Sequence, residues 1–88
     1  MMEDKVALIS GGTSGIGLAT AAWLLEKGAR VVISGRSREK GEKALAQLGN
    51  AERCFFAAAD VADDAACRRL AVQAKEHWGR LDILVNSA

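Results

Sequence analysis

The 88-residue sequence predicts an α/β fold that is built on a parallel sheet. Short apolar runs, typical of buried strands, alternate with longer helical patterns along the chain. Strands separated by helices of about ten residues or more need crossover connections, which are right-handed and give parallel pairing. No proline, repeat, low-complexity tract or linker divides the sequence. We therefore expect one domain over residues 1–88, with three helices and about four strands in the spatial order 3-2-1-4, one half of a doubly wound sheet.

The first strand–helix unit is expected close to the start of the chain. Residues 5–10 are short, apolar and bounded by glycine, which predicts a buried strand. The helical pattern of residues 15–27 starts after Ser14, a suitable N-cap, and stops at Gly28. Few residues of this helix are polar, so we expect it to be covered on most sides, with Trp23 in the core.

The second unit joins a strand at residues 31–33 to a helix that Ser37 caps and that extends to about Leu48. Gly41, inside this helix, is expected to weaken it by about 1 kcal/mol relative to alanine. Gly49 follows the last apolar position and ends the helix. Three apolar residues share one helix face: Ala44, Leu45 and Leu48.

The last two strands are expected at residues 54–59 and 81–86. Between them, a helix that Asp63 caps and Gly79 stops carries an apolar stripe, with polar residues away from it. The fourth strand has apolar residues on both faces, Leu84 among them, as buried parallel strands do. The stripe of the helix consists of Cys67, Leu70, Ala71, Ala74 and Trp78.

The composition argues against several classes of function. Half of the residues are hydrophobic and 26% are charged, as in globular proteins. The net charge of +1 gives no reason to expect a nucleic acid or an anionic membrane as partner. No apolar stretch approaches the roughly 20 residues of a membrane-spanning helix, and no signal-peptide pattern opens the chain. Cys54 and Cys67 fit no metal or redox spacing, so we expect free thiols and a cytoplasmic location.

The most informative motif is the glycine-rich turn at residues 10–17, Ser-Gly-Gly-Thr-Ser-Gly-Ile-Gly. Glycines let the backbone approach a phosphate closely, and the helix that follows offers unpaired N–H groups and the positive end of its dipole. A tight turn that merely needs the conformational freedom of glycine is the alternative. The position of the turn, directly after the first strand of a βαβ unit, favours phosphate binding.

Two further motifs follow the third and fourth strands, Asp60-Val61 and Asn86-Ser87-Ala88. Ligands of open α/β sheets bind beyond the carboxyl ends of the strands. Together with the glycine-rich turn, these motifs resemble the classical short-chain dehydrogenase/reductase family over essentially the whole chain. The resemblance implies a Rossmann-like fold and a nicotinamide cofactor, in an oxidoreductase that interconverts a carbonyl and an alcohol. A 3-oxoacyl-carrier-protein reductase-like enzyme is one candidate.

The same resemblance implies roles at the cofactor site. Three glycines would shape the pyrophosphate turn, and three further residues would lie near the phosphates and the ribose: Gly11, Gly15 and Gly17, and then Thr13, Ser14 and Ile16. Asp60 would accept a hydrogen bond from the adenine amino group, and the Val61 backbone would complete that pocket. Asn86 and Ala88 would line the wall beside the ribose, with Asn86 also bracing the central strands. Taken singly, Asp60 fits a helix-entry position and Asn86 a strand-end turn equally well. Ser87 stands where the family motif has a second asparagine.

The end of the second strand indicates which cofactor is bound. NAD enzymes place an acidic side chain there for the ribose 2′-hydroxyl, whereas NADP enzymes offer a cation to the 2′-phosphate. Here Gly35 stands in the acidic position and Arg36 follows, able to form two parallel charge-assisted bonds, with Arg38 nearby. A solvated basic helix start is the alternative. We expect NADP rather than NAD.

The sequence contains no tyrosine. The family resemblance implies a catalytic serine, tyrosine and lysine that these residues do not supply, so we expect no turnover from the chain alone. It is interpreted as the N-terminal part of one NAD(P)-binding domain, truncated after the fourth strand and prone to self-association through that open edge. The resemblance also implies a homo-oligomeric parent enzyme. The alternatives are a non-catalytic nucleotide-binding or interaction module, or a decayed gene product.

Overall fold

The computed structural model describes residues 2–11, 13, 15–49, 52–60 and 64–86. Strands and helices alternate in the predicted order, and their bounds differ from the predicted ones by one or two residues at several ends. Ser14 and Asp63, the predicted N-caps of two helices, lie outside the described residues. The elements are β1 (Val6–Ser10), α1 (Gly15–Glu26), β2 (Arg30–Gly35), α2 (Arg38–Leu48), β3 (Cys54–Ala58), α3 (Asp64–Trp78) and β4 (Ile83–Asn86).

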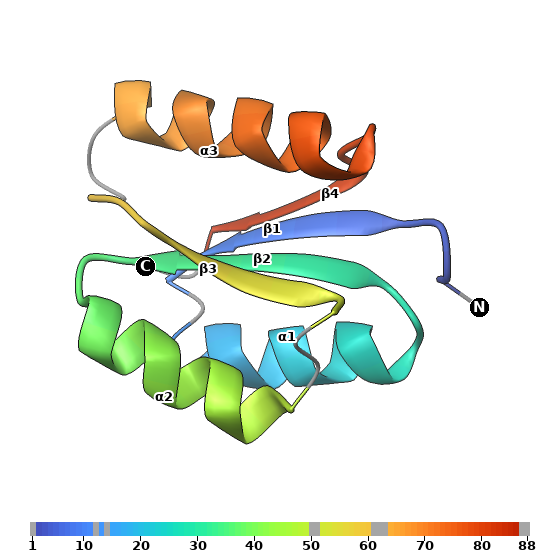
Figure 1. Ribbon diagram of the computed structural model, residues 1–88, viewed down its shortest axis with the longest axis horizontal. Coiled ribbons are helices and arrows are strands. Elements are labelled where there is room, and N and C mark those ends of the chain that lie inside the picture. Colours follow the sequence, from blue (N-terminus) through green and yellow to red (C-terminus); the bar gives the residue numbers. More distant parts are fainter. Residues whose placement is uncertain (1, 12, 14, 50–51, 61–63, 87–88) are drawn as a thin grey trace.

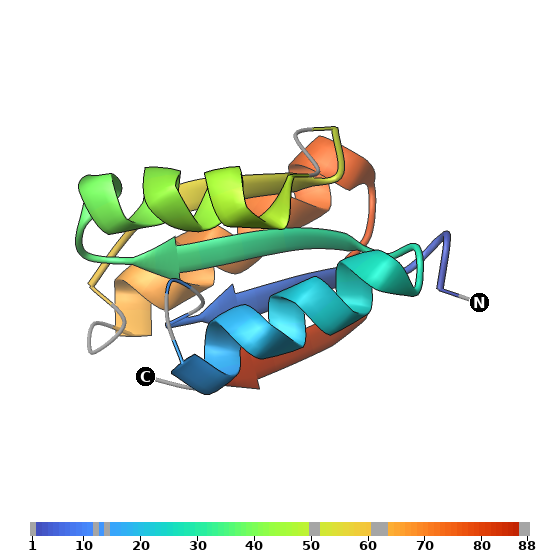
Figure 2. The same ribbon diagram turned by 90° about the horizontal axis from the view of Figure 1, so that it is seen from below.

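The strands form one parallel sheet in the order β3-β2-β1-β4, as predicted. Figure 1 shows α3 on one face of the sheet and α1 and α2 on the other. Seen from below, α1 and α2 run side by side across that second face (Figure 2). In the register of the sheet, Leu8 of β1 pairs with Val32 of β2 and with Leu84 of β4. Crossover connections of this kind place helices on both faces, so the central strands are buried on both sides.

Alternate residues of the central strands fill two separate cores, because successive side chains of a strand point to opposite faces. Ile9 and Ile33 belong to the core beneath α1 and α2. Leu8 and Val32 belong to the core beneath α3, where they pack with Leu70. All five side chains are almost completely buried. The sheet is therefore held by a hydrophobic layer on each side.

The two ends of α2 are formed as the sequence predicts. Ser37 Oγ accepts a hydrogen bond from Lys40 N at 3.2 Å. At the other end, Gly49 adopts the left-handed conformation with a φ angle of 69°, and its N–H donates to the carbonyl of Leu45. Both caps satisfy backbone groups that a helix end leaves unpaired.

The expectation that α1 is covered on most sides, with Trp23 in the core, is wrong. Trp23 is 51% exposed and Ile16 is 80% exposed. The Lys27 Nζ atom lies 5.7 Å from the centre of the exposed Trp23 ring. Hydropathy counts apolar residues but does not tell which of them another element covers. The buried residues of α1 lie on the one face that meets the sheet: Gly17, Ala21, Leu24 and Leu25.

Gly41 is required by packing, so the expectation that it weakens α2 relative to alanine needs correction. It is buried, and a Cβ atom at this position would lie 2.4 Å from Cδ1 and 2.5 Å from Cγ of Phe56. The ring of Phe56, from β3, occupies the space that a side chain at position 41 needs. Helix propensity alone favours alanine here. The tertiary structure favours glycine.

The apolar stripe of α3 packs on the sheet as predicted. Leu70 and Ala74 are buried, and the ring centre of Trp78 lies 5.2 Å from that of Phe55 in β3. Trp78 is only partly buried and lies at the margin of this core. The side chain of Cys67, also assigned to the stripe, lies outside the described part of the structure.

The strand β4 begins two residues later than predicted. It begins at Ile83, and half-buried and exposed residues alternate along it. Ile83 and Val85 pack against the core beneath α1 and α2, whereas Leu84 on the opposite face is 67% exposed. Leu84 is apolar, as predicted, and the core beneath α3 does not cover it.

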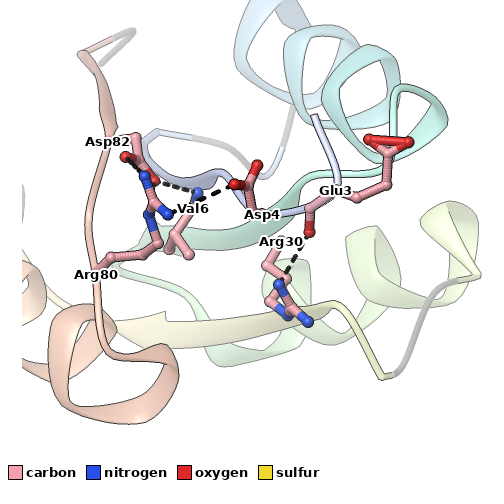
Figure 3. Close-up of polar contacts among 6 residues, drawn as sticks. All are labelled: Glu3, Asp4, Val6, Arg30, Arg80 and Asp82. Carbon is pink, nitrogen blue, oxygen red and sulfur yellow. Dashed lines mark hydrogen bonds and ion pairs between the residues drawn. The ribbon is translucent and has the colours of Figure 1, made fainter. Parts of the chain in front are cut away.

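A cluster of charged residues joins the amino ends of β1 and β4 (Figure 3). The Asp82 Oδ2 atom accepts a hydrogen bond from Val6 N at 2.9 Å. Arg80 donates to both oxygens of the same carboxylate, from Nε at 2.8 Å and from Nη2 at 2.7 Å. Asp4 lies 3.7 Å from Arg80 Nη1. The hydrogen bonds from Arg80, and then the one from Val6, hold the pKa of Asp82 below its usual value.

Folding stability should consequently depend on Asp82 at acid pH. A carboxylate whose pKa is lowered by folding stabilises the native state above its unfolded pKa of about 3.9, and this stabilisation is lost as the pH falls through the folded-state pKa. We expect Asp82→Asn to lower stability near neutral pH and to make the acid-induced loss shallower. Urea unfolding of wild type and variant from neutral pH to about pH 2 measures this. Glu42→Gln, at an exposed position of α2, is the control, and identical profiles for wild type and Asp82→Asn would contradict the role of the cluster.

Candidate functional site

The carboxyl ends of all four strands lie along one edge of the sheet, together with the first turns of the three helices (Figure 1, left). We call this the carboxyl edge, defined by the strand ends at Ser10, Gly35, Ala58 and Asn86. The charged cluster around Asp82 lies at the opposite end of the strands. Open α/β sheets bind their ligands at the carboxyl edge. The candidate residues of the sequence follow these same strand ends.

The glycine-rich turn crosses the carboxyl edge between β1 and α1. Gly11 and Gly15 have positive φ angles of 78° and 58°, which residues with a Cβ rarely adopt. The N–H of Gly11 donates to the carbonyl of Ser34 at 2.9 Å, which ties the turn to β2. A Cβ atom at Gly15 would meet no atom within 4 Å, so packing does not require glycine there. The positive φ angle of Gly15 is what favours glycine at this position, and without a side chain the backbone is open to a ligand.

The start of α1 is suited to bind an anion. Its first turn contains no acidic residue, so the helix itself does not neutralise its unpaired N–H groups and the positive end of its dipole. The first turn of α2, by contrast, contains the acidic residue Glu39. Gly17 is buried in α1, as close packing of the helix on the sheet requires. Ile16 is exposed beside it.

The end of β2 lies against the glycine-rich turn. A Cβ atom at Gly35 would lie 3.2 Å from Cγ2 of Thr13, so there is little space for a side chain between the two segments. Arg36 follows Gly35 and is exposed, and within the described part of the chain it forms no ion pair. The guanidinium of Arg38 lies 5.8 Å from the centre of the Phe56 ring. Arg38 is exposed as well, and Arg36 is the one of the two that directly follows the end of β2.

Ser10 and Asn86 connect β1 and β4 at the same edge. Ser10 is almost completely buried. Its Oγ atom lies 3.1 Å from Asn86 Oδ1 and 3.4 Å from the carbonyl oxygen of Val85, and donates to these acceptors. Ser10 was not predicted as a separate site residue. The feature of the sequence that could have indicated Ser10 is a hydroxyl residue at the end of an otherwise apolar strand.

Asp60 follows β3 and is exposed at the carboxyl edge. It lines a pocket of about 280 Å³ whose other walls come from the end of β3 and from α3: Ala58, Ala59, Ala66, Arg69, Leu70 and Gln73. Three more predicted site residues, Ser14, Val61 and Ala88, lie outside the described residues. The structure thus brings together the turn, Arg36 and Asn86, with Asp60 further along the same edge.

The described groups of the carboxyl edge favour binding of a phosphorylated ligand. They include backbone N–H groups, the hydroxyls of Ser10 and Thr13, the amide of Asn86, the carboxylate of Asp60 and the guanidinium of Arg36. Within the described residues no three His, Cys, Asp or Glu side chains are grouped to hold a metal ion. Burial raises the pKa of the Cys54 thiol to about 11, which keeps it from acting as a nucleophile near neutral pH. None of the described helices is both long and apolar enough to span a membrane.

A parallel sheet in this strand order, with a glycine-rich turn after its first strand, defines the nucleotide-binding class of doubly wound α/β proteins. The model of the short chain dehydrogenase family matches residues 5–88. The chain belongs to that family.

Individual relatives show the same relationship. The chain is 43% identical over 87 residues to the rhamnolipids biosynthesis 3-oxoacyl-(acyl-carrier-protein) reductase of Pseudomonas aeruginosa, and 40% identical over 87 residues to the NADP-dependent (R)-specific alcohol dehydrogenase of Lentilactobacillus kefiri. Each match covers 99% of this chain and 34% of the relative. The crystal structure of a short chain dehydrogenase from Bacillus anthracis matches with a TM-score of 0.92 and 37% identity, over 100% of this chain and 36% of that one. The chain spans about a third of the length of these proteins.

Proposed function

We propose that the chain binds NADP(H) at the carboxyl edge, as the N-terminal part of the dinucleotide-binding domain of an oxidoreductase. The observation that carries this proposal is the turn between β1 and α1. Its two positive-φ glycines leave the backbone open in front of a helix start that has no acidic residue. A pyrophosphate placed there receives N–H hydrogen bonds and the positive end of the helix dipole. In this proposal three glycines shape the pyrophosphate turn and three further residues lie near the phosphates and the ribose: Gly11, Gly15 and Gly17, and then Thr13, Ser14 and Ile16.

The adenosine half of the cofactor extends along the carboxyl edge from this turn. Asp60 would accept a hydrogen bond from the adenine amino group, and the backbone of Val61 would complete that pocket. Asn86 and Ala88 line the wall beside the ribose. The contact between Ser10 and Asn86 supports this arrangement, since it connects β4 to the strand that carries the glycine-rich turn.

The preference for NADP(H) over NAD(H) rests on Gly35 and Arg36. An acidic residue at the end of β2 would hold the ribose 2′-hydroxyl of NAD, and glycine cannot. The exposed guanidinium of Arg36 is available to pair with the 2′-phosphate of NADP through two parallel hydrogen bonds. The name of the NADP-dependent relative from Lentilactobacillus kefiri supports the same choice.

The reaction proposed for the whole protein is the interconversion of a carbonyl and an alcohol. A bound nicotinamide cofactor supplies or accepts the hydride, while the residues of this chain hold and orient the cofactor. The relative from Pseudomonas aeruginosa makes a 3-oxoacyl group one candidate for the substrate.

Substitution of Arg36 by aspartate tests the cofactor assignment. We expect Arg36→Asp to weaken NADPH binding by about 10- to 100-fold, because hydrogen bonds between charged groups are lost and a like charge is introduced. NADH affinity should stay the same or rise. Titration of purified protein with each cofactor gives both dissociation constants. Arg38→Asp is the matched control and should have the smaller effect, since Arg38 lies against Phe56. Equal affinity of the wild type for the two cofactors would refute the role of Arg36.

A further inference from the structure

The contact between Thr13 and Gly35 joins the glycine-rich turn to the end of β2. The backbone around Gly35 is held on two sides. The carbonyl of Ser34 accepts a hydrogen bond from Gly11 N at 2.9 Å, and the carbonyl of Gly35 accepts one from Ala59 N at 2.9 Å. Gly35 therefore has little freedom to move away from the turn.

The space beside Gly35 is limited by one methyl group. A Cβ atom at position 35 would lie 3.2 Å from Cγ2 of Thr13, 3.5 Å from its Oγ1 and 3.9 Å from Cε1 of Phe56. Optimal carbon–carbon contacts are about 3.5–4.0 Å, so only the Cγ2 contact is too short. Gly35 is not among the glycines with positive φ, and its backbone conformation is open to other residues. Among the described residues, the Thr13 methyl group is the atom that a Cβ at this position would meet too closely.

We propose that Thr13 determines cofactor specificity by keeping an acidic side chain out of position 35. This inference rests on the proposed binding of NADP(H), and it adds a second determinant beside Arg36. An aspartate at position 35 presses on Thr13, which belongs to the turn that holds the pyrophosphate. The displacement weakens the binding of both cofactors, so the aspartate brings no gain for NADH while the Thr13 methyl group remains. Removing that methyl group makes position 35 able to carry the acid.

Four proteins test the proposal: wild type, Thr13→Ser, Gly35→Asp and the double variant. Serine keeps the Oγ atom, whose 3.5 Å distance from a Cβ atom at position 35 is an ordinary contact, and removes only Cγ2. We expect Gly35→Asp to weaken the binding of both NADPH and NADH. The double variant should bind NADH about tenfold more tightly than Gly35→Asp does, because it can form a charged hydrogen bond to the ribose. Titration with each cofactor measures these constants. An equal gain in NADH affinity from Gly35→Asp with threonine or with serine at position 13 would overturn the proposal.

A second measurement needs no cofactor. Gly35→Ala should lower the melting temperature, although glycine-to-alanine replacements at permitted backbone angles usually raise it. Thr13→Ser should restore the melting temperature of Gly35→Ala, whereas Thr20→Ser, which removes a methyl group from a half-buried position of α1, should not. Gly35→Ala without any effect would overturn the steric argument. If Thr13→Ser restores stability but the wild type prefers NADH or binds neither cofactor, the proposed function fails, and the specificity role of Thr13 fails with it.

Discussion

Replacing Gly41 by alanine is expected to destabilise the protein by about 1–3 kcal/mol or more, the usual range for overpacking in a core. The added Cβ atom would lie within 2.6 Å of three atoms of the Phe56 ring, Cγ, Cδ1 and Cδ2, which are the ring atoms nearest to the backbone. The ring cannot swing away as the end of a long flexible side chain can. Helix propensity alone predicts the opposite sign, a gain of about 1 kcal/mol. Urea unfolding therefore separates the two effects.

Two further proteins make the Gly41 result specific. Ala46→Gly, at an exposed position of the same helix, reports propensity without the clash and should lose about 1 kcal/mol. In a Phe56→Ala background, Gly41→Ala should become neutral or stabilising, because the ring that it meets is absent. A Gly41→Ala protein as stable as the wild type would show that Phe56 moves at little cost.

Replacing Leu8 by alanine is expected to cost about 2–5 kcal/mol, the range for truncating a buried leucine. Leu8 is 1% exposed and lies at the centre of the core beneath α3. Net stabilities of small domains are about 5–15 kcal/mol, so this single change removes a large share of the total.

Leu84 provides a matched control for Leu8. It is the register partner of Leu8 on β4, on the same face of the sheet, but is 67% exposed. Leu84→Ala should change stability by about 0.5 kcal/mol or less, as surface substitutions do. Equal losses for the two variants, measured by urea unfolding, would mean that Leu84 is covered in solution, for example by self-association. A concentration-dependent melting temperature would identify that case.

The candidate site could be located from the sequence because its pattern is local. The glycines of residues 10–17 stand directly between an apolar strand and a helix, and their spacing reports a turn that any strand–helix unit of this kind would place at the sheet edge. The same reasoning put Arg36 and Asn86 after strands whose ends meet there. It could not find the contact of Thr13 with Gly35, since these residues are 22 positions apart and their approach depends on how the turn packs on β2.

By itself, the sequence determined the type and order of the seven elements, the parallel 3-2-1-4 sheet and the caps of α2 at Ser37 and Gly49. The elements and the caps follow from hydrophobic periods and from residues at helix ends, where the interacting groups are at most a few positions apart. The parallel sheet order follows from the crossover connections between its strands. Only the tertiary structure decided that Trp23 is exposed and that Gly41 accommodates Phe56. These outcomes depend on which surfaces of different elements meet. Local periodicity does not encode that choice, because burial belongs to the contact between elements and not to the side chain alone.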